Sequence, residues 1–183
     1  ILRNFNDKDG IYYWYSIKKE FEILKEKEGK ENSLKFLNSK LNKFKIKSSK
    51  VYFDLGNIYK GFKEYNKSIE YFNLALEGIS KESESYADIL YRRGGSYERI
   101  KNYKEADKDL LNALSVSPND AYVLNYLAYS WLERNYKIEE AIDMLHIAYN
   151  QRKNDPYIID SVGWGYFLTG DYVNAEKYIQ QAV

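Results

Sequence analysis

The residues of this chain that could act in catalysis are few and scattered. His146 is the single histidine, and no acidic, serine or cysteine constellation of recognisable catalytic spacing accompanies it. Ser16 and Lys19 match a Ser-x-x-Lys nucleophile motif, but the companion motifs of that class are missing. Because general acid–base and nucleophilic chemistry needs several convergent groups, the sequence predicts that the protein is not an enzyme.

Sites for a metal ion, a cofactor or a phosphate are not indicated either. The chain has no cysteine, which excludes disulfides and thiolate metal sites. The carboxylates of Glu139, Glu140 and Asp143 are typical of a solvated helix face. The glycines of Gly94-Gly95 and Gly163-Trp-Gly165 lie inside helical patterns, whereas phosphate-binding loops follow a strand and open a helix. We expect no cofactor and no metal.

A cluster of basic residues offers a second kind of chemistry, the attraction of polyanions. No acidic residue occurs between Asn32 and Phe53, and the basic residues in this stretch include Lys40, Lys43, Lys45, Lys47 and Lys50. Such a cluster can attract nucleic acid or an acidic surface. The favoured interpretation is a solvated linker, because the charges are local and belong to a chain of net charge +1. We expect no nucleic-acid partner, and binding through Lys40–Lys50 stays the alternative.

The elements around these residues are organised by a repeat. Small residues recur in the first half of each unit, at Gly56, Gly94, Ala128 and Gly163. Two columns recur in the second half: Ser68, Ala106, Ala141 and Ala175, then Ala75, Ala113, Ala148 and Ala182. The members of the last column are 38, 35 and 34 residues apart. Since helices cross closely only where side chains are small, each unit is predicted to be two short packed helices.

With these columns the chain resembles the tetratricopeptide repeat (TPR) family. That family carries Leu-Gly-x-x-Tyr in its first helix, then Ala, an aromatic or Leu, and Ala in its second, with Pro at the end. The matching residues in the first helices are Leu55-Gly56-Asn-Ile-Tyr59, Gly94-Gly-Ser-Tyr97, Leu127-Ala128-Tyr-Ser-Trp131 and Val162-Gly163-Trp-Gly-Tyr166. Those in the second helices are the two small columns with Phe72, Leu110, Leu145 and Ile179 between them. The resemblance implies an all-α, right-handed α-solenoid of tandem helix-turn-helix units.

The predicted organisation is one continuous solenoid domain. Residues 1–48 form an N-terminal helix remnant and a degenerate helix pair, Trp14–Leu24 and Ser33–Leu41, with its turn at Gly29. Four repeats follow, at 49–86 with a loop insertion, 87–120, 121–155 and 156–183, the last truncated. The chain begins at Ile1 and ends within a second helix. This pattern favours a segment of a longer protein, whose exposed apolar end would support end-to-end self-association.

Two departures from the family pattern carry predictions. Arg93 occupies a column where the family prefers Leu, which predicts either locally weaker packing or a buried ion pair. Family members that bind chaperone tails grip a carboxylate with Lys, Asn and Arg from successive first helices. Asn57 fits that clamp, but Phe53 and Tyr126 stand where the Lys and the Arg should be. We therefore expect no recognition of chaperone C-terminal tails.

The resemblance also implies where a partner binds. Family members hold a protein or a peptide on the concave wall lined by the first helices, which makes this chain a predicted interaction scaffold. The corresponding residues are Phe53, Asn57, Tyr91, Arg92, Tyr122, Asn125, Tyr126, Tyr129, Tyr157, Asp160, Ser161 and Trp164. Tyr, Trp and Arg dominate interface energetics. With 20 tyrosines in the chain, some of these side chains are equally expected to pack between helices.

The sequence says little about the compartment. No apolar run approaches the roughly 20 residues that span a bilayer, so no membrane span is predicted. The stretches Leu124–Ser130 and Pro156–Trp164 resemble bacterial tetratricopeptide proteins, several of which are exported through the inner membrane. This similarity implies the periplasm or envelope, with the cytoplasm as the alternative.

Overall fold

The computed structural model describes residues 10–42 and 48–183, and every regular element within these ranges is an α-helix. The chain divides into two compact units, residues 1–78 and 79–183, which we call unit 1 and unit 2. Unit 1 contains α1 (Ile11–Leu41), α2 (Ser49–Gly61) and α3 (Tyr65–Leu76). Unit 2 contains α4 (Glu84–Arg99), α5 (Tyr103–Val116), α6 (Ala121–Glu133), α7 (Ile138–Gln151), α8 (Pro156–Leu168) and α9 (Tyr172–Ala182).

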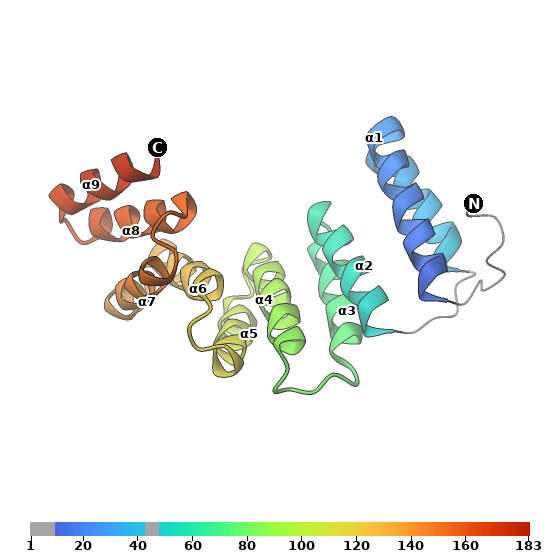
Figure 1. The fold of residues 1–183 in the computed structure, drawn as a ribbon, viewed down its shortest axis with the longest axis horizontal. Coiled ribbons are helices and arrows are strands. Elements are labelled where there is room, and N and C mark those ends of the chain that lie inside the picture. Colours follow the sequence, from blue (N-terminus) through green and yellow to red (C-terminus); the bar gives the residue numbers. More distant parts are fainter. Residues whose placement is uncertain (1–9, 43–47) are drawn as a thin grey trace. The chain divides into compact units, whose positions relative to one another are not determined.

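The helices follow one another as pairs, and Figure 1 shows each pair as adjacent ribbons. The pairs α2/α3, α4/α5, α6/α7 and α8/α9 contact each other most extensively. We call α2, α4, α6 and α8 the first helices and their partners the second helices. The predicted all-α fold class of tandem helix pairs is confirmed for the described residues.

Helix α1 is itself two helical segments that meet at Gly29. This glycine has φ 79° and ψ −174°, a backbone conformation that residues with a Cβ rarely adopt. Leu37, after the turn, packs with Trp14, Ile17 and Phe21, before the turn, in one buried cluster. The predicted turn at Gly29 is confirmed, although the first segment begins at Ile11 and continues past Leu24.

The start of each first helix is fixed by a side-chain cap. Ser48, Ser83, Asp120 and Asp155 each accept a hydrogen bond from a backbone N–H of the first turn that follows. Such a cap stabilises a helix by about 1 kcal/mol. Serine and aspartate directly before an apolar helix therefore position the first helices from local sequence alone.

The turn inside each pair has one repeated backbone geometry. The carbonyls of Tyr59, Tyr97, Trp131 and Tyr166 each accept a hydrogen bond from the N–H five residues later, at 2.9 to 3.0 Å. The residue before each donor is left-handed, with φ of 61° at Lys63, 61° at Lys101, 52° at Asn135 and 82° at Gly170. This is the Schellman arrangement, which satisfies carbonyls at the helix end and reverses the chain.

The small columns lie where the two helices of a pair touch. A Cβ on Gly56 would lie 2.5 Å from Cε1 of Phe72, and one on Gly163 would lie 2.8 Å from Cγ1 of Ile179. The equivalent distance from Gly94 to Cγ of Leu110 is 3.0 Å. Any side chain at these positions would push the second helix away. The close-packing interpretation of these glycines is confirmed.

The departure at Arg93 is resolved in favour of a buried ion pair. Nε and Nη2 of Arg93 on α4 donate to Oδ2 and Oδ1 of Asp109 on α5, each at 2.7 Å. Asp109 is 1% exposed. A comparable polar contact exists in unit 1, where Nε1 of Trp14 and Nζ of Lys18 both donate to Asp54 at 2.9 Å. Burial opposes the ionisation of Asp54, but these two donors outweigh it and lower the pKa of that carboxyl.

Candidate functional site

The two predicted site residues of unit 1 lie on α2. The ring of Phe53 packs against Phe72, with ring centroids 6.1 Å apart, and Nζ of Lys50 lies 5.5 Å from its centroid. The side chain of Asn57 donates to the carbonyl of Phe53 at 3.0 Å and borders a pocket of about 200 Å³ between α1 and α2. Phe53 is therefore engaged in packing, while Asn57 reaches a hollow surface.

The ten predicted site residues of unit 2 come from α4, α6 and α8, and α6 contacts both of the other two helices. We call this set the first-helix face: Tyr91, Arg92, Tyr122, Asn125, Tyr126, Tyr129, Tyr157, Asp160, Ser161 and Trp164. The structure places these residues on three first helices that lie beside one another. It does not bring them together with a reactive group.

The centre of the first-helix face is held by a tyrosine pair. The rings of Tyr91 and Tyr126 meet edge to face, with centroids 5.8 Å apart and planes at 90°. The hydroxyl of Tyr126 donates to Oε2 of Glu98 at 3.1 Å. Burial and the Glu98 carboxylate raise the pKa of Tyr126, which keeps this phenol protonated as a donor. These contacts fix the orientation of Tyr126.

Tyr129 lies beside two carboxylates from different helices. Partial burial raises its pKa, and so do the negative charges of Glu133 on α6 and Asp160 on α8, while the positive charge of Arg99 on α4 acts in the opposite direction. The ring is 40% exposed, while both acidic residues are exposed. The charges that act on Tyr129 are therefore of both signs, two carboxylates and one guanidinium.

Exposure separates the tyrosines of the face into two kinds. Tyr122 is 45% exposed and Tyr157 is 81% exposed, so both present their rings to solvent together with Tyr129. The guanidinium carbon of Arg152 lies 5.2 Å from the centroid of the Tyr122 ring. Tyr126 is half-buried. The exposed tyrosine rings of the face are therefore concentrated on α6 and the start of α8.

The remaining members of the face are mostly engaged within the protein. Ser161 is 5% exposed and its hydroxyl donates to the carbonyl of Tyr157 at 2.9 Å. Trp164 stacks on Phe167, with centroids 5.3 Å apart. Oδ1 of Asn125 and Nε1 of Trp164 are buried and have no hydrogen-bond partner in residues 10–42 and 48–183. An unpaired buried polar atom costs about 1–3 kcal/mol, so Asn125 and Trp164 are the strained polar positions of the face.

Sequence reasoning missed two acidic residues of this surface, Glu98 and Glu133. Glu98 and Glu133 follow Tyr91 and Tyr126 by seven residues, which is two helical turns, so each carboxylate lies on the same side of its helix as the tyrosine. Arg92 was predicted as a contact residue, but its Nε is 2.9 Å from Oδ1 of Asp88. The seven-residue spacing from Tyr91 to Glu98 and from Tyr126 to Glu133 was the sequence signal that could have identified both glutamates.

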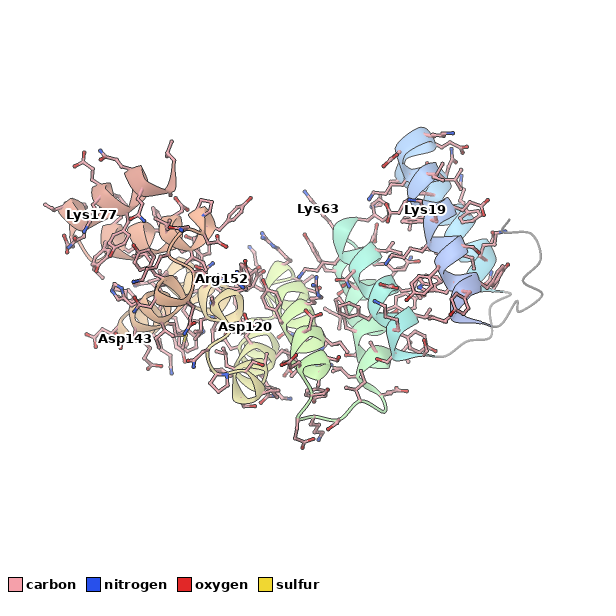
Figure 2. The ribbon with its side chains drawn as sticks, viewed as in Figure 1. Lys19, Lys63, Asp120, Asp143, Arg152 and Lys177 are labelled. Carbon is pink, nitrogen blue, oxygen red and sulfur yellow. The ribbon has the colours of Figure 1, made fainter. Side chains whose placement is uncertain are left out.

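Two hollows beside the face were also missed, because their walls come from several helices. One of about 400 Å³ lies between α4, α5 and α6 and is lined by Tyr91, Glu84, Asp88 and Asp120 among others. Another of about 370 Å³ includes Asp120 and Arg152, both labelled in Figure 2, and Tyr122. The first-helix face is thus bordered by concave surface at the N-terminal ends of α4 and α6.

The residues with catalytic potential have local structural partners. His146 is half-buried, and its Nε2 lies 3.2 Å from the hydroxyl of Tyr166. The hydroxyl of Ser16 donates to the carbonyl of Tyr13 at 2.8 Å. No group of three or more His, Cys, Asp or Glu side chains that could hold a metal ion occurs in the described part of the chain. Within the same ranges no helix has the length and apolar character needed to cross a membrane.

The basic segment is only partly described, because Lys43, Lys45 and Lys47 lie outside the described residues. Nζ of Lys40 is 5.1 Å from the ring centroid of Phe36. Nζ of Lys50 is 3.5 Å from Oδ1 of Asp54. The two described ends of the segment therefore make contacts within unit 1.

Part of the chain matches a known protein family. Residues 49–77 and 87–120 match the family model of the tetratricopeptide repeat. The TPR repeat-containing protein PA4667 of Pseudomonas aeruginosa is 31% identical over 107 residues, which is 58% of this chain and 18% of that protein. This chain spans less than a quarter of the length of the curated relatives that it matches.

Solved structures agree with the fold. BtubC from P. vanneervenii superposes with a TM-score of 0.77 at 18% identity, over 93% of this chain and 78% of that one. YrrB, described as a TPR protein with an unusual peptide-binding site, superposes with a TM-score of 0.65 at 19% identity, over 97% and 86% of the two chains. At these identities the likeness shows the fold, and it confirms the predicted α-solenoid class.

Proposed function

We propose that this chain, whose residues 49–77 and 87–120 match the tetratricopeptide repeat, is a protein–protein interaction scaffold that binds a partner segment on the first-helix face of unit 2. The protein performs no chemistry on that segment. The binding surface is the side of α4, α6 and α8 that carries the ten residues named above. A peptide or an exposed segment of a partner protein is the ligand; the structural neighbour YrrB is described as having a peptide-binding site.

The observation that carries this proposal is a set of exposed tyrosines on consecutive first helices. Tyr122, Tyr129 and Tyr157 are 45%, 40% and 81% exposed. Single exposed aromatics are ordinary, whereas several on neighbouring elements are typical of an interaction surface. Tyrosine supplies contact area with a polar tip and loses little conformational entropy on binding.

The face is also partly organised in advance. Tyr126 is held by Glu98 and by the ring of Tyr91. A rigid centre lowers the ordering cost that association otherwise imposes. Tyr126 thus supports the exposed rings, which make the contact.

The proposal is tested by changing only the exposed tyrosines. The variant Tyr122→Ala, Tyr129→Ala, Tyr157→Ala removes three rings without touching the packed positions. The matched control is Ile147→Ala with Val173→Ala, which removes side chains that are 42% and 81% exposed on α7 and α9. Each lost interface anchor costs about 1–2 kcal/mol of binding free energy, so the triple variant should bind the partner more than a hundredfold more weakly than wild type.

Partners are captured from cell extract on wild type, triple variant and control, after both variants show a native helical melt. The proposal predicts a specific protein that is retained by wild type and control and lost from the triple variant. Equal capture by all three proteins would rule out the first-helix face as the binding surface.

A further inference from the structure

The connection between α7 and α8 carries an arginine whose hydrogen-bond donors are unused. The guanidinium carbon of Arg152 lies 5.2 Å from the centroid of the Tyr122 ring, and the side chain is exposed. A cation over the face of a ring keeps its N–H donors available for oxygen acceptors, and a guanidinium has five of them. Arg152 forms no ion pair and no side-chain hydrogen bond with any residue in the ranges 10–42 and 48–183. A positioned but unsatisfied donor group therefore borders the first-helix face.

Two hollows meet at this arginine. The hollow of about 370 Å³ is lined by Tyr122 and Arg152 among others, and a second, of about 480 Å³, is lined by Arg152, Lys153 and Tyr157 among others. Tyr122 and Tyr157 are both exposed members of the first-helix face. Arg152 therefore lies where a segment that contacts both rings would run between them.

Acidic residues also line these hollows, so the charge there is balanced rather than positive. Asp120 lines the first hollow and Asp155 the second. Each carboxylate accepts hydrogen bonds of 2.9 to 3.1 Å from backbone N–H groups of the helix that it caps, and neither forms an ion pair with Arg152. The acids of the adjoining hollow on α4, Glu84 and Asp88, line neither hollow at Arg152. The attraction for a ligand therefore comes from the unused donors and not from a net positive charge.

We propose that the partner segment places the carboxylate of an internal aspartate or glutamate on Arg152, with apolar neighbours that pack on Tyr122 and Tyr157. This inference rests on the proposed function and specifies its ligand. A carboxylate accepts two parallel hydrogen bonds from the planar edge of a guanidinium. A phosphorylated side chain, with a charge of about −1.5 to −2, is repelled more strongly by Asp120 and Asp155. An internal residue fits because the segment continues to a tyrosine on each side of Arg152.

The test begins with a library of random peptides displayed inside a loop of a carrier protein, so that no terminal carboxylate is present. Peptides retained by wild type are sequenced, and we expect aspartate or glutamate to be enriched at one position between apolar residues. The tightest peptide is then synthesised with glutamate, glutamine or lysine at that position, and its dissociation constant is measured by fluorescence anisotropy at low salt. The glutamate peptide should bind about fivefold more tightly than the glutamine peptide, as a partly exposed ion pair allows. The lysine peptide should bind most weakly.

Variants assign that preference to Arg152. The substitution Arg152→Gln should reduce the preference for glutamate over glutamine to about twofold or less, with the glutamine peptide bound as before. The matched control Lys177→Gln removes another exposed cation beside a tyrosine, because Nζ of Lys177 lies 5.5 Å from the ring centroid of Tyr178 on α9. Figure 2 labels both Arg152 and Lys177. The control should keep the full preference, and both variants are first shown to have a native helical melt.

A shortened peptide separates an internal acid from a chain end. It stops at the enriched position with a free terminal carboxylate, and it should bind wild type more weakly than the glutamate peptide because it loses the contact beyond Arg152. Raising the salt concentration should weaken the glutamate peptide more than the glutamine peptide.

The outcomes separate the two proposals. The inference about the acidic residue is overturned if no peptide is retained by wild type, if no acidic position is enriched, or if the preference for glutamate survives in Arg152→Gln. Equal or tighter binding of the shortened peptide overturns it as well. If partner capture still depends on Tyr122, Tyr129 and Tyr157 in any of these cases, the proposed function stands without it. If capture is also independent of those tyrosines, both fail.

Discussion

Removing one member of the Arg93–Asp109 pair should destabilise unit 2 far more than removing both. The guanidinium and the carboxylate form two parallel hydrogen bonds of 2.7 Å between α4 and α5. The side chain of Arg93 is 19% exposed and that of Asp109 is 2% exposed. Each charge therefore depends on the other for its stability inside the helix pair.

The expected magnitudes follow from this burial. Breaking a buried ion pair by removing one partner costs about 3–5 kcal/mol. Arg93 keeps a small path to solvent, so we expect Asp109→Leu to cost about 2–4 kcal/mol in the free energy of unfolding. The double variant Arg93→Leu, Asp109→Leu places a leucine where the family prefers one and leaves no buried charge. Its stability should equal that of wild type or exceed it by about 1 kcal/mol or more.

The assay is urea unfolding of wild type, both single variants and the double variant, followed by helical circular dichroism. The free energies of unfolding are compared only if their slope against urea concentration is the same for all four proteins. The difference between the double variant and the sum of the two single variants gives the coupling energy, which we expect to be about 2–4 kcal/mol or larger. A double variant whose loss equals that sum within about 0.5 kcal/mol would refute the reasoning.

Three further predictions concern the packing, a turn and the response to acid. Gly56→Ala should lose about 1–3 kcal/mol, because its Cβ would lie 2.5 Å from a phenylalanine ring on α3, while Gly61→Ala points into open space and should gain up to about 1 kcal/mol. Equal urea midpoints for these two variants would contradict this packing. Lys101 has a φ of 61°, so Lys101→Gly should be more stable than Lys101→Ala by about 1 kcal/mol in the free energy of unfolding, measured by thermal unfolding. Identical melting temperatures of the two variants would argue against a strained turn. The lowered pKa of Asp54 means that its contribution to stability is complete above the ordinary pKa of an aspartate and is lost as the pH falls through the lowered folded-state pKa. Asp54→Asn should therefore flatten the acid side of the curve of stability against pH, and an unchanged acid side would exclude this carboxylate as its cause.

Much of the fold was predictable because the repeat encodes it locally. The small columns through Gly56 and Gly163 mark where two helices touch, and the shortest distances from an added Cβ to a neighbouring atom are found at these two glycines. Asp120 and Asp155 precede apolar stretches and cap the helices that follow. The small columns were located from their recurrence alone, and each cap depends on one residue directly before its helix.

Features that depend on residues far apart in the chain were less accessible. The sequence left Arg93 open between weak packing and an ion pair, since its partner Asp109 is 16 residues away on another helix. The contact of Trp14 with Asp54 spans 40 residues and follows no column of the repeat. Only the packed structure brings these groups together.

The candidate site shows the same limit. The first-helix columns predicted Tyr126 and Tyr129 equally, but the first is half-buried and bound to Glu98 while the second is exposed. That difference is set by α4 and α8, which lie on either side of α6. Likewise Ser161 occupies a predicted contact position, yet its hydroxyl is bound to the backbone of its own helix.

The central claim is that a partner touches the exposed tyrosines of α6 and α8, and site-specific photocrosslinking tests this contact most directly. A benzoylphenylalanine in place of Tyr129 is compared with one in place of Ile147, which is equally exposed on α7. The account predicts a covalent adduct with the partner protein from the Tyr129 position and none from the Ile147 position. An adduct from Ile147 alone, or a partner that co-purifies without crosslinking at Tyr129, would contradict it.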